Sequence, residues 1–273
     1  GKKGSGKSTF AYHLVNFFLS KDEELKYDLI ENKINSENKS FKLLQNNSHP
    51  NFYLIDLLAE KKNIDVAQIR GMISYTNKST FNNQDRFIMI DNVEYLNKNS
   101  INALLKIIEE PNENIYFILI NNSEKNMLPT LKSRCITFKI HFSFDETVNI
   151  CNQILNQNIL NELNHDLINY YCTPGEIIKL VQFAEEKQIN LKDHDNSSII
   201  SLIIENTYYK KNIFIKNLLI NFIELFLLKR YKTSNNKNFL LNFYQSFIQK
   251  INNTEKFNLD EESLFLEFKS KIL

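Results

Sequence analysis

Residues 1–9 of the chain read GKKGSGKST, which matches the pattern G-x-x-x-x-G-K-[ST]. Glycines at these spacings allow a loop whose backbone N–H groups point inward around phosphate groups, and the helix that follows directs the positive end of its dipole at them. In this pattern Lys7 reaches the β- and γ-phosphates of a nucleotide, and the Ser8 hydroxyl binds Mg²⁺. The stretch therefore predicts a nucleotide site made by Gly1, Gly4, Ser5, Gly6, Lys7, Ser8 and Thr9.

Glycine is scarce outside this loop, since the 273 residues include five glycines and three of them lie among the first six residues. The hydrophobic content of 42% is enough for a folded core and excludes collagen-like and disordered chains. The net charge of +1 excludes a strongly basic nucleic-acid coat. Because such a loop normally follows a strand, and the chain starts without methionine, we expect a strand to precede Gly1 in a longer protein.

Short apolar runs alternate with helical patterns over the first 140 residues. The runs at 52–55, 87–90, 115–120 and 136–140 predict strands of a parallel sheet that is covered on both faces. Residues 10–18 and 101–108 repeat apolar side chains at helical spacing. Strands that alternate with helices indicate an α/β fold with a doubly wound parallel sheet.

The pattern changes after about residue 143, where the strand signals stop. Helices are predicted over 144–155, 161–171 and 174–187, and the polar stretch 192–198 predicts a linker. The segment 213–228 predicts a long helix with a wide apolar face, which suits either a bundle core or a partner surface. Its charged and amide side chains argue against a membrane span.

A second motif ends the apolar run 87–90, where Asp91 is predicted to lie near the Mg²⁺ that Ser8 binds. The next residue is Asn92, whereas hydrolytic enzymes with this layout carry a glutamate that activates water. An amide is no general base at neutral pH, and loss of such a base commonly lowers the rate by about 10²–10⁴-fold. The sequence predicts a nucleotide site that hydrolyses poorly.

These motifs resemble those of the bacterial clamp-loader subunits of DNA polymerase III, which are AAA+ proteins. The resemblance extends over residues 1 to about 140 and is closest to the delta-prime type of subunit. It is carried by DNVEYLN at 91–97, NALLK at 102–106, EEP at 109–111, LPTLKSRC at 128–135, HPNF at 49–52 and IDVAQIR at 64–70.

The resemblance implies an AAA+ nucleotide-binding domain over 1–142, a helical lid over 143–192 and a helical collar for oligomerisation over 193–273. It also implies ATP and Mg²⁺ as cofactors. The implied partners are the other subunits of a hetero-pentameric ring, a sliding clamp and the phosphates of primer–template DNA, which Lys98 and Lys106 could contact, although ordinary surface lysines are the simpler interpretation. The implied location is the cytoplasm.

The same resemblance suggests roles for individual residues. Arg134, in the S-R-C segment, corresponds to an arginine finger that enters the neighbouring subunit's ATP site; the alternative is a structural arginine that pairs with an acid on its own sheet edge. Asn121 matches a polar sensor of the γ-phosphate, or has no role. Glu176 stands near the place where active relatives carry a lid arginine, and no cysteine precedes Cys135, so that zinc is not expected.

Three hypotheses follow for the function. The first is a delta-prime-like clamp-loader subunit that binds ATP, hydrolyses it poorly and donates Arg134 to its neighbour. The second is a self-sufficient AAA+ ATPase, the motor type of subunit, against which Asn92 and Glu176 argue. The third is a generic P-loop kinase or transferase, against which the motifs after Asp91 argue.

Overall fold

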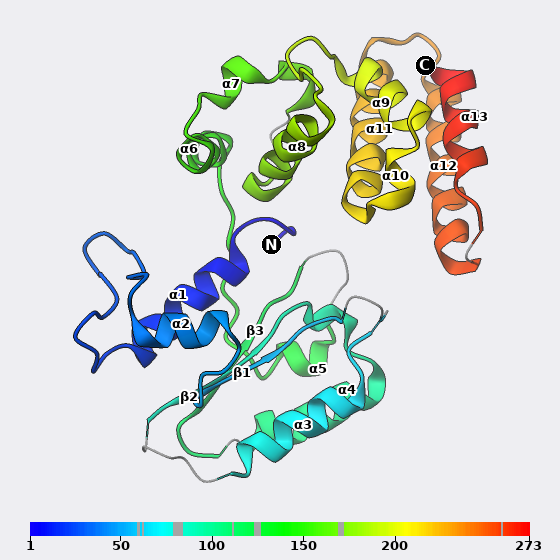
Figure 1. Cartoon of the computed structure of the whole chain (residues 1–273). Coiled ribbons are helices and arrows are strands. Elements are labelled where there is room, and N and C mark those ends of the chain that lie inside the picture. The colour runs from blue at the N-terminus through cyan, green and yellow to red at the C-terminus, as the bar shows by residue number, and fades with distance from the viewer. Residues whose placement is uncertain are drawn as a thin grey trace. The chain divides into compact units, whose positions relative to one another are not determined.

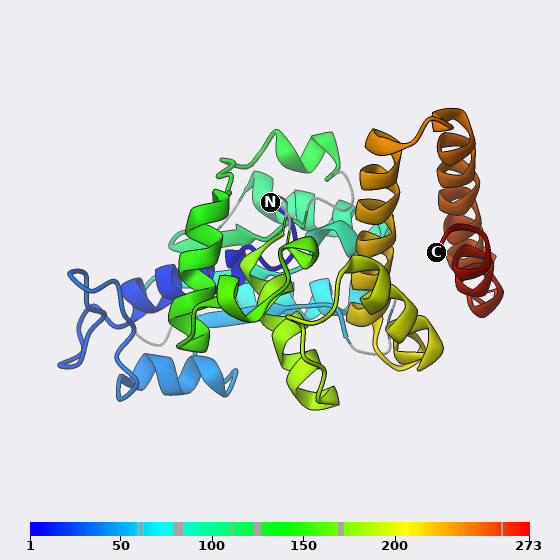
Figure 2. The same cartoon turned by 90° about the horizontal axis from the view of Figure 1, so that it is seen from above.

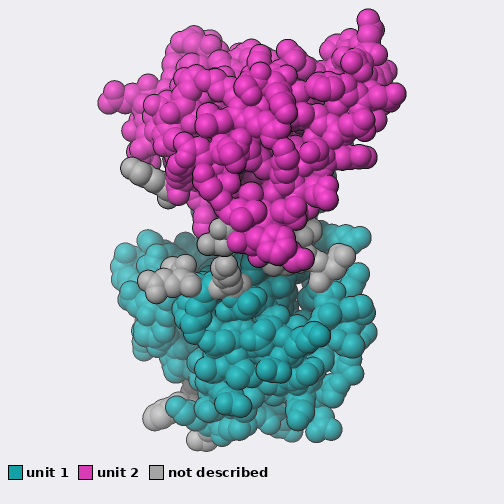
Figure 3. Space-filling view, turned by 90° about the vertical axis from the view of Figure 1, so that its right-hand side faces the viewer, with its two compact units in different colours: residues 1–142 teal, residues 143–273 magenta. Residues whose placement is uncertain are grey.

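The chain divides into two units, residues 1–142 and 143–273 (Figure 3). The buried apolar residues of each unit cluster within that unit. The computed structural model describes residues 1–58, 61, 63–78, 84–110, 112–122, 127–168, 172–257 and 259–273.

The first unit contains a parallel sheet of three strands in the order β1-β2-β3 (Figure 1). The strands are β1 (Phe52–Ile55), β2 (Arg86–Ile90) and β3 (Ile115–Leu119). Phe52 pairs with Phe87, and Phe87 pairs in turn with Tyr116. Every residue of the central strand β2 is buried, as expected for a strand with neighbours on both edges and helices on both faces. Three of the four predicted strands are thus confirmed, together with the α/β class.

Helices cover both faces of this sheet (Figure 1). On one face lie α1 (Lys7–Leu19) and α2 (Lys39–Gln45), whose apolar side chains pack on Phe87 and Met89. The other face carries the helices α3 (Val66–Thr76), η1 (Val93–Tyr95), α4 (Lys98–Glu109) and α5 (Pro129–Lys132). The helix predicted from residues 10–18 exists, but its buried side is formed by Ala11, Val15 and Leu19, while Phe10, Leu14 and Phe18 are exposed.

The strand predicted over 136–140 is wrong. These residues form no strand, and Ile136 and Phe138 are 86% and 82% exposed. A strand exists only through its ladder of hydrogen bonds, and in the described part of the chain no strand pairs with this segment. An apolar run with β-branched residues is therefore not sufficient to predict a strand at residues 136–140.

Asparagine supplies the left-handed backbone conformations of this glycine-poor chain. In the described residues, five of the seven non-glycine positions with positive φ are asparagines, namely Asn32, Asn47, Asn92, Asn114 and Asn156. Asparagine adopts this conformation more readily than other L residues because its short amide can hydrogen-bond locally. Several turns and helix ends thereby form without glycine.

The second unit is helical throughout its described residues. Its elements are α6 (Phe144–Leu155), α7 (Ile159–Glu162), η2 (His165–Leu167), α8 (Pro174–Lys187), α9 (Asn196–Glu205), α10 (Tyr208–Lys211), α11 (Ile213–Thr233), α12 (Lys237–Phe257) and α13 (Glu262–Ile272). In its C-terminal part α11 packs against α9 and α12, and α13 lies beside α12 (Figure 2). One core runs from Val148 to Ile272. Among the described residues, no helix combines the length and apolar character that crossing a bilayer requires.

Capping residues explain which of the helices predicted for the second unit are correct. The helices predicted over 144–155 and 174–187 have those bounds, because Ser143 and Thr173 each form a capping box with a glutamate three residues on. The helix predicted over 161–171 is wrong. Asn164 accepts a hydrogen bond from the Asp166 N–H and starts the short helix η2 instead; residues 169–171 lie outside the described residues.

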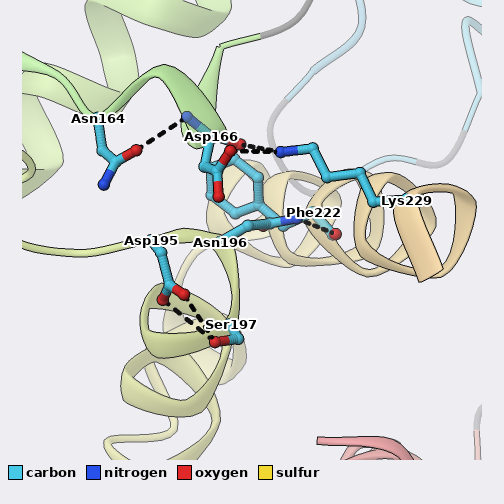
Figure 4. A network of polar contacts seen from close by, with 7 residues as sticks. All are labelled: Asn164, Asp166, Asp195, Asn196, Ser197, Phe222 and Lys229. Atoms are coloured by element: carbon cyan, nitrogen blue, oxygen red, sulfur yellow. Dashed lines mark hydrogen bonds and ion pairs between the residues drawn. The ribbon is translucent and has the colours of Figure 1, made fainter. Parts of the chain in front are cut away.

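Polar contacts connect η2, α9 and α11 (Figure 4). The Lys229 Nζ lies 2.8 Å from Asp166 Oδ1, and the buried Asn196 Nδ2 donates to the Phe222 carbonyl oxygen at 3.1 Å. Asp195 caps α9 by accepting from the Ser198 N–H, so that the predicted linker 192–198 already contains the start of this helix. Segments on both sides of residue 192 thus share contacts and a core.

Candidate nucleotide site

The glycine-rich loop lies at the N-terminus of α1, and two of its glycines adopt backbone conformations that favour glycine. Gly4 has a φ of +82° and Gly6, the N-cap of α1, a φ of +71°. Gly1 is needed for a different reason, because a Cβ there would come within 2.6 Å of the Ile140 carbonyl oxygen. The buried Ser5 closes the turn by donating its hydroxyl to the Lys2 carbonyl oxygen at 2.9 Å.

The Lys7 side chain folds back over this loop. Its Nζ donates to the carbonyl oxygens of Gly1, at 2.9 Å, and Lys2, at 2.5 Å. The ammonium group is therefore held at the loop that would surround the phosphates, where its charge would complement theirs. Thr9, the last residue of the predicted site, is exposed on α1.

Ser8 and Asp91 are brought together from positions far apart in the sequence. The Ser8 hydroxyl donates to Asp91 Oδ2 at 2.5 Å, and the other carboxylate oxygen, Oδ1, accepts from the Asn92 N–H at 2.8 Å. The contact exists because Asp91 directly follows the central strand and α1 starts beside it. A hydroxyl and a carboxylate are the hard oxygen ligands that Mg²⁺ prefers, usually with several waters. The donor set therefore fits a magnesium ion bound with a nucleotide.

The side chain of Asn92 is held on both sides. Its Nδ2 donates to Asp56 Oδ1 at 2.7 Å, and its Oδ1 accepts from the Asn122 Nδ2 at 2.8 Å. Its backbone lies in the left-handed region, with a φ of +57°. The three residues follow β1, β2 and β3, and therefore meet at the carboxyl edge of the sheet. The amide that the sequence predicts in place of a catalytic glutamate is therefore held by two hydrogen bonds.

The two asparagines after β3 have different environments. Asn122 is buried and also donates its N–H to Glu94 Oε2 at 3.2 Å. Asn121, the predicted sensor, has a buried Oδ1 that accepts no hydrogen bond in the described part of the chain. Asn122, and not Asn121, thus contacts Asn92.

Negative charge gathers at this edge of the sheet. Burial first, and then the carboxylates of Asp91 and Asp56, raise the pKa of the Tyr12 phenol, which α1 carries. The phenol is therefore neutral at pH 7. Lys7 supplies the positive charge on the opposite, loop side.

Arg134 lies just after α5 and forms an ion pair within its own unit. Its Nη2 is 2.5 Å from Glu109 Oε1, at the end of α4, and its Nη1 donates to the Thr130 carbonyl oxygen at 2.8 Å. The side chain is still 37% exposed. The arginine pairs with an acid of its own unit, but this acid ends the helix α4 and does not lie on the sheet edge, where the structural alternative placed it. The guanidinium still faces solvent, as a finger requires.

The remaining candidate residues are also located. Glu176 belongs to the capping box of α8, where its Oε2 accepts from the Thr173 N–H at 2.9 Å. Its carboxylate is thereby committed to the helix start. Lys98 and Lys106 are exposed on α4.

Sequence reasoning missed Asp56, Asn122, Glu94 and Glu109. Asp56 and Asn122 each follow a strand, so that a topology with parallel neighbours could have suggested that they lie near Asn92. The pairing of Glu109 with Arg134 has no signal in the sequence.

Comparisons with known proteins connect this geometry to a family. Residues 1–143 match the family described as "DNA polymerase III, delta subunit". The DNA polymerase III subunit delta' of Pseudomonas aeruginosa is 31% identical over 100 residues, which cover 37% of this chain and 30% of the relative. That of Bacillus subtilis is 26% identical over 193 residues, or 68% of this chain and 54% of the relative.

Each of these two matches therefore spans less than two thirds of the relative's length. Among solved structures, a DNA polymerase III gamma subunit-related protein of Thermotoga maritima superposes with a TM-score of 0.35 at 18% identity. The superposition covers 72% of this chain and 62% of the other.

Proposed function

Because the chain belongs to the family of DNA polymerase III delta-type subunits, which are clamp-loader proteins, we propose that it is a delta-prime-like subunit of a bacterial replicative clamp loader. In this role it assists the ATP-dependent loading of a sliding clamp on primed DNA in the cytoplasm. Its partners are the other subunits of a hetero-pentameric ring, the clamp and the phosphates of the primer–template. Residues 1–142 serve as the AAA+ domain, 143–192 as the lid and 193–273 as the collar.

In our proposal the chain binds Mg-ATP at the loop of residues 1–9. The observation that supports this best is the contact between Ser8 and Asp91, because it joins a loop hydroxyl to a strand-end carboxylate as a magnesium–phosphate complex requires. Lys7 would hold the terminal phosphates, with further contacts from Gly1, Gly4, Ser5, Gly6, Thr9 and Asn121. Bound nucleotide would supply the charge that Lys7 neutralises.

The same site hydrolyses ATP poorly in this proposal. Asn92 cannot accept a proton from water, and its amide is already engaged with Asp56 and Asn122. The chain instead contributes to the hydrolysis of its neighbour through Arg134, whose guanidinium stabilises the charge of the γ-phosphate in trans.

Nucleotide binding is tested by calorimetry on the purified chain with Mg-ATP, with Lys7→Ala as the comparison. We expect binding by the natural chain, weakened at least about tenfold in Lys7→Ala because a charge-assisted contact is lost. No heat at millimolar nucleotide would contradict the proposed site. Robust ATP turnover by the chain alone would favour the motor type of subunit instead.

Arg134 is tested in the ring reconstituted with the other loader subunits, clamp and primed DNA. Arg134→Ala is expected to leave ATP binding by this subunit unchanged and to stop turnover at the one neighbouring site, since such a finger contributes about 10³–10⁵ in rate. The ATPase rate of the whole ring should therefore fall by the fraction of the total turnover that this neighbouring site contributes. An unchanged ring rate would leave Arg134 with a structural role.

A further inference from the structure

The Arg134 guanidinium has a defined set of contacts within the first unit. It contacts one carboxylate oxygen of Glu109 at 2.5 Å, the Thr130 carbonyl oxygen at 2.8 Å and the Ser133 hydroxyl at 3.4 Å. Thr130 lies in α5 and Glu109 ends α4, so that two helices together fix the direction of the side chain. An isolated arginine on a surface turn would sample many rotamers instead.

The position of Glu109 is not explained by the stability of α4. It is the last residue of that helix, where the dipole favours cations and a carboxylate is unfavourable. The ion pair is also exposed, with 37% of the Arg134 and 47% of the Glu109 side chain accessible, and exposed pairs contribute little to stability. The carboxylate therefore has its main effect on the arginine that it holds.

The contacts leave part of the guanidinium available. Arginine carries five N–H donors, and the three contacts, to Glu109, Thr130 and Ser133, involve only Nη1 and Nη2. Among the described residues, the Nε–H and at least one N–H on an Nη atom have no acceptor. A phosphate oxygen can be contacted by these donors while Glu109 stays in place.

We propose that Glu109 is a positioning residue for Arg134, which holds the guanidinium in the orientation from which it contacts the neighbouring subunit's nucleotide. This inference rests on the proposed function, since it presupposes that Arg134 acts in trans. Without Glu109 the side chain must be ordered when the contact forms, and immobilising such a side chain typically lowers an association or rate by about 3- to 10-fold.

The experiment uses the reconstituted ring with clamp and primed DNA, and compares Glu109→Gln and Glu109→Ala with the natural chain. We expect kcat of the finger-dependent turnover to fall about 3- to 10-fold for Glu109→Ala and less for Glu109→Gln, which keeps an acceptor. KM for ATP stays the same, because the contact acts on the transition state. Glu110→Gln is the matched control, as Glu110 forms no ion pair in the described part of the chain.

A second arm repeats the Glu109 variants in the Arg134→Ala background. If Glu109 acts through Arg134, its substitution has no further effect there, whereas a structural role would persist. Co-purification of the ring and the unfolding midpoint of each variant show that the chain is folded and assembled.

The outcomes separate this inference from the proposed function. The positioning role is wrong, and the proposed function stands, if Arg134→Ala lowers the ATPase rate of the ring while Glu109→Ala leaves that rate unchanged or raises it. The positioning role is equally wrong if the Glu109 effect persists without Arg134. If Arg134→Ala itself has no effect, the proposed function fails, and the inference with it.

Discussion

The hydrogen bond between the Asn92 amide and Asp56 predicts that a carboxylate at position 92 would lower the stability of the chain. In Asn92→Asp a second carboxylate would face Asp56 in place of the hydrogen bond of 2.7 Å, while aspartate still tolerates the positive φ. We expect a loss of about 1–3 kcal/mol in the free energy of unfolding at pH 7. The loss shrinks as the pH falls below about 5, because protonation of either carboxyl relieves the repulsion. Urea unfolding at both pH values measures it.

The double variant Asp56→Asn/Asn92→Asp restores a single charge on the pair and should recover most of the lost stability. Asn114→Asp is the control, since Asn114 is exposed and has a similar φ of +59°. Equal losses in the single and double variants would mean that the pairing with Asp56 does not matter.

His49 gives the first unit a dependence on pH. Its Nδ1 accepts from the Asn51 N–H at 3.1 Å, so that Nε2 carries the hydrogen and faces the Ser40 hydroxyl at 3.2 Å; this hydroxyl lies 2.6 Å from Glu23 Oε1. Burial lowers the pKa of His49, and the nearby Glu23 offsets this only in part. Protonation would put a hydrogen on Nδ1, against the Asn51 N–H.

Because the pKa of His49 is lower in the folded than in the unfolded state, the unfolded chain binds more protons as the pH falls below about 6.5. Stability therefore decreases with falling pH until the folded pKa is passed. Hydrogen exchange of β1 and α2 between pH 7 and 5 should show this decrease in the natural chain and a smaller one in His49→Gln. His141→Gln, at an exposed histidine, should keep the natural slope.

At the scale of the element, the C-terminus of α3 is capped by a buried arginine that belongs to the strand β2. Arg86, at the start of β2, donates to the carbonyl oxygens of Tyr75 at 3.0 Å, Lys78 at 3.0 Å and Thr76 at 3.2 Å, and its guanidinium lies over the Tyr75 ring. A cation at a helix C-terminus satisfies carbonyl groups that the helix cannot pair itself.

Arg86→Met should lower the free energy of unfolding of the first unit by about 1–3 kcal/mol, since three carbonyl oxygens lose their hydrogen-bond donor. Arg86→Lys retains the charge but not the planar set of donors, and should lose less. Arg70→Met, on the exposed side of α3, should change the free energy by less than about 0.5 kcal/mol. Hydrogen exchange at the end of α3 measures the effect locally. A larger loss in Arg70→Met than in Arg86→Met would contradict the capping role.

The bounds of a helix could be predicted from the sequence where capping residues next to its first turn determine them. The bounds of α6 and α8 follow from Ser143 and Thr173 with their partner glutamates, which the sequence displays. The segment 136–140 has a strand pattern, but pairing is decided by a distant neighbour, so the local pattern could not exclude the error.

The same distinction applies to the candidate site. The loop and Asp91 were visible as motifs, while Asp56, Asn122 and Glu109 acquire their contacts only through the sheet order and the packing of α4 and α5.

At the scale of the whole molecule, the two units have separate cores. The buried apolar residues of 1–142 form two clusters on the faces of the sheet, and those of 143–273 form one cluster that includes residues on both sides of position 192. Cooperativity follows contiguous packing, so we expect each unit to unfold as its own cooperative unit. Residues 143–192 and 193–273 should then unfold together even if they serve different functions.

Two matched core variants of the full chain test this. Phe268→Ala removes a fully buried ring from the second unit and should lower its stability by about 3–5 kcal/mol. Ile88→Ala, in β2, should do the same to the first unit by about 2–5 kcal/mol. Hydrogen exchange resolved by segment is expected to show faster exchange in α8 and α11 for Phe268→Ala, with β2 unchanged, and the reverse pattern for Ile88→Ala. Faster exchange in α11 but not in α8 after Phe268→Ala would mean that the second unit divides near residue 192, and faster exchange in β2 would mean that the cores are coupled.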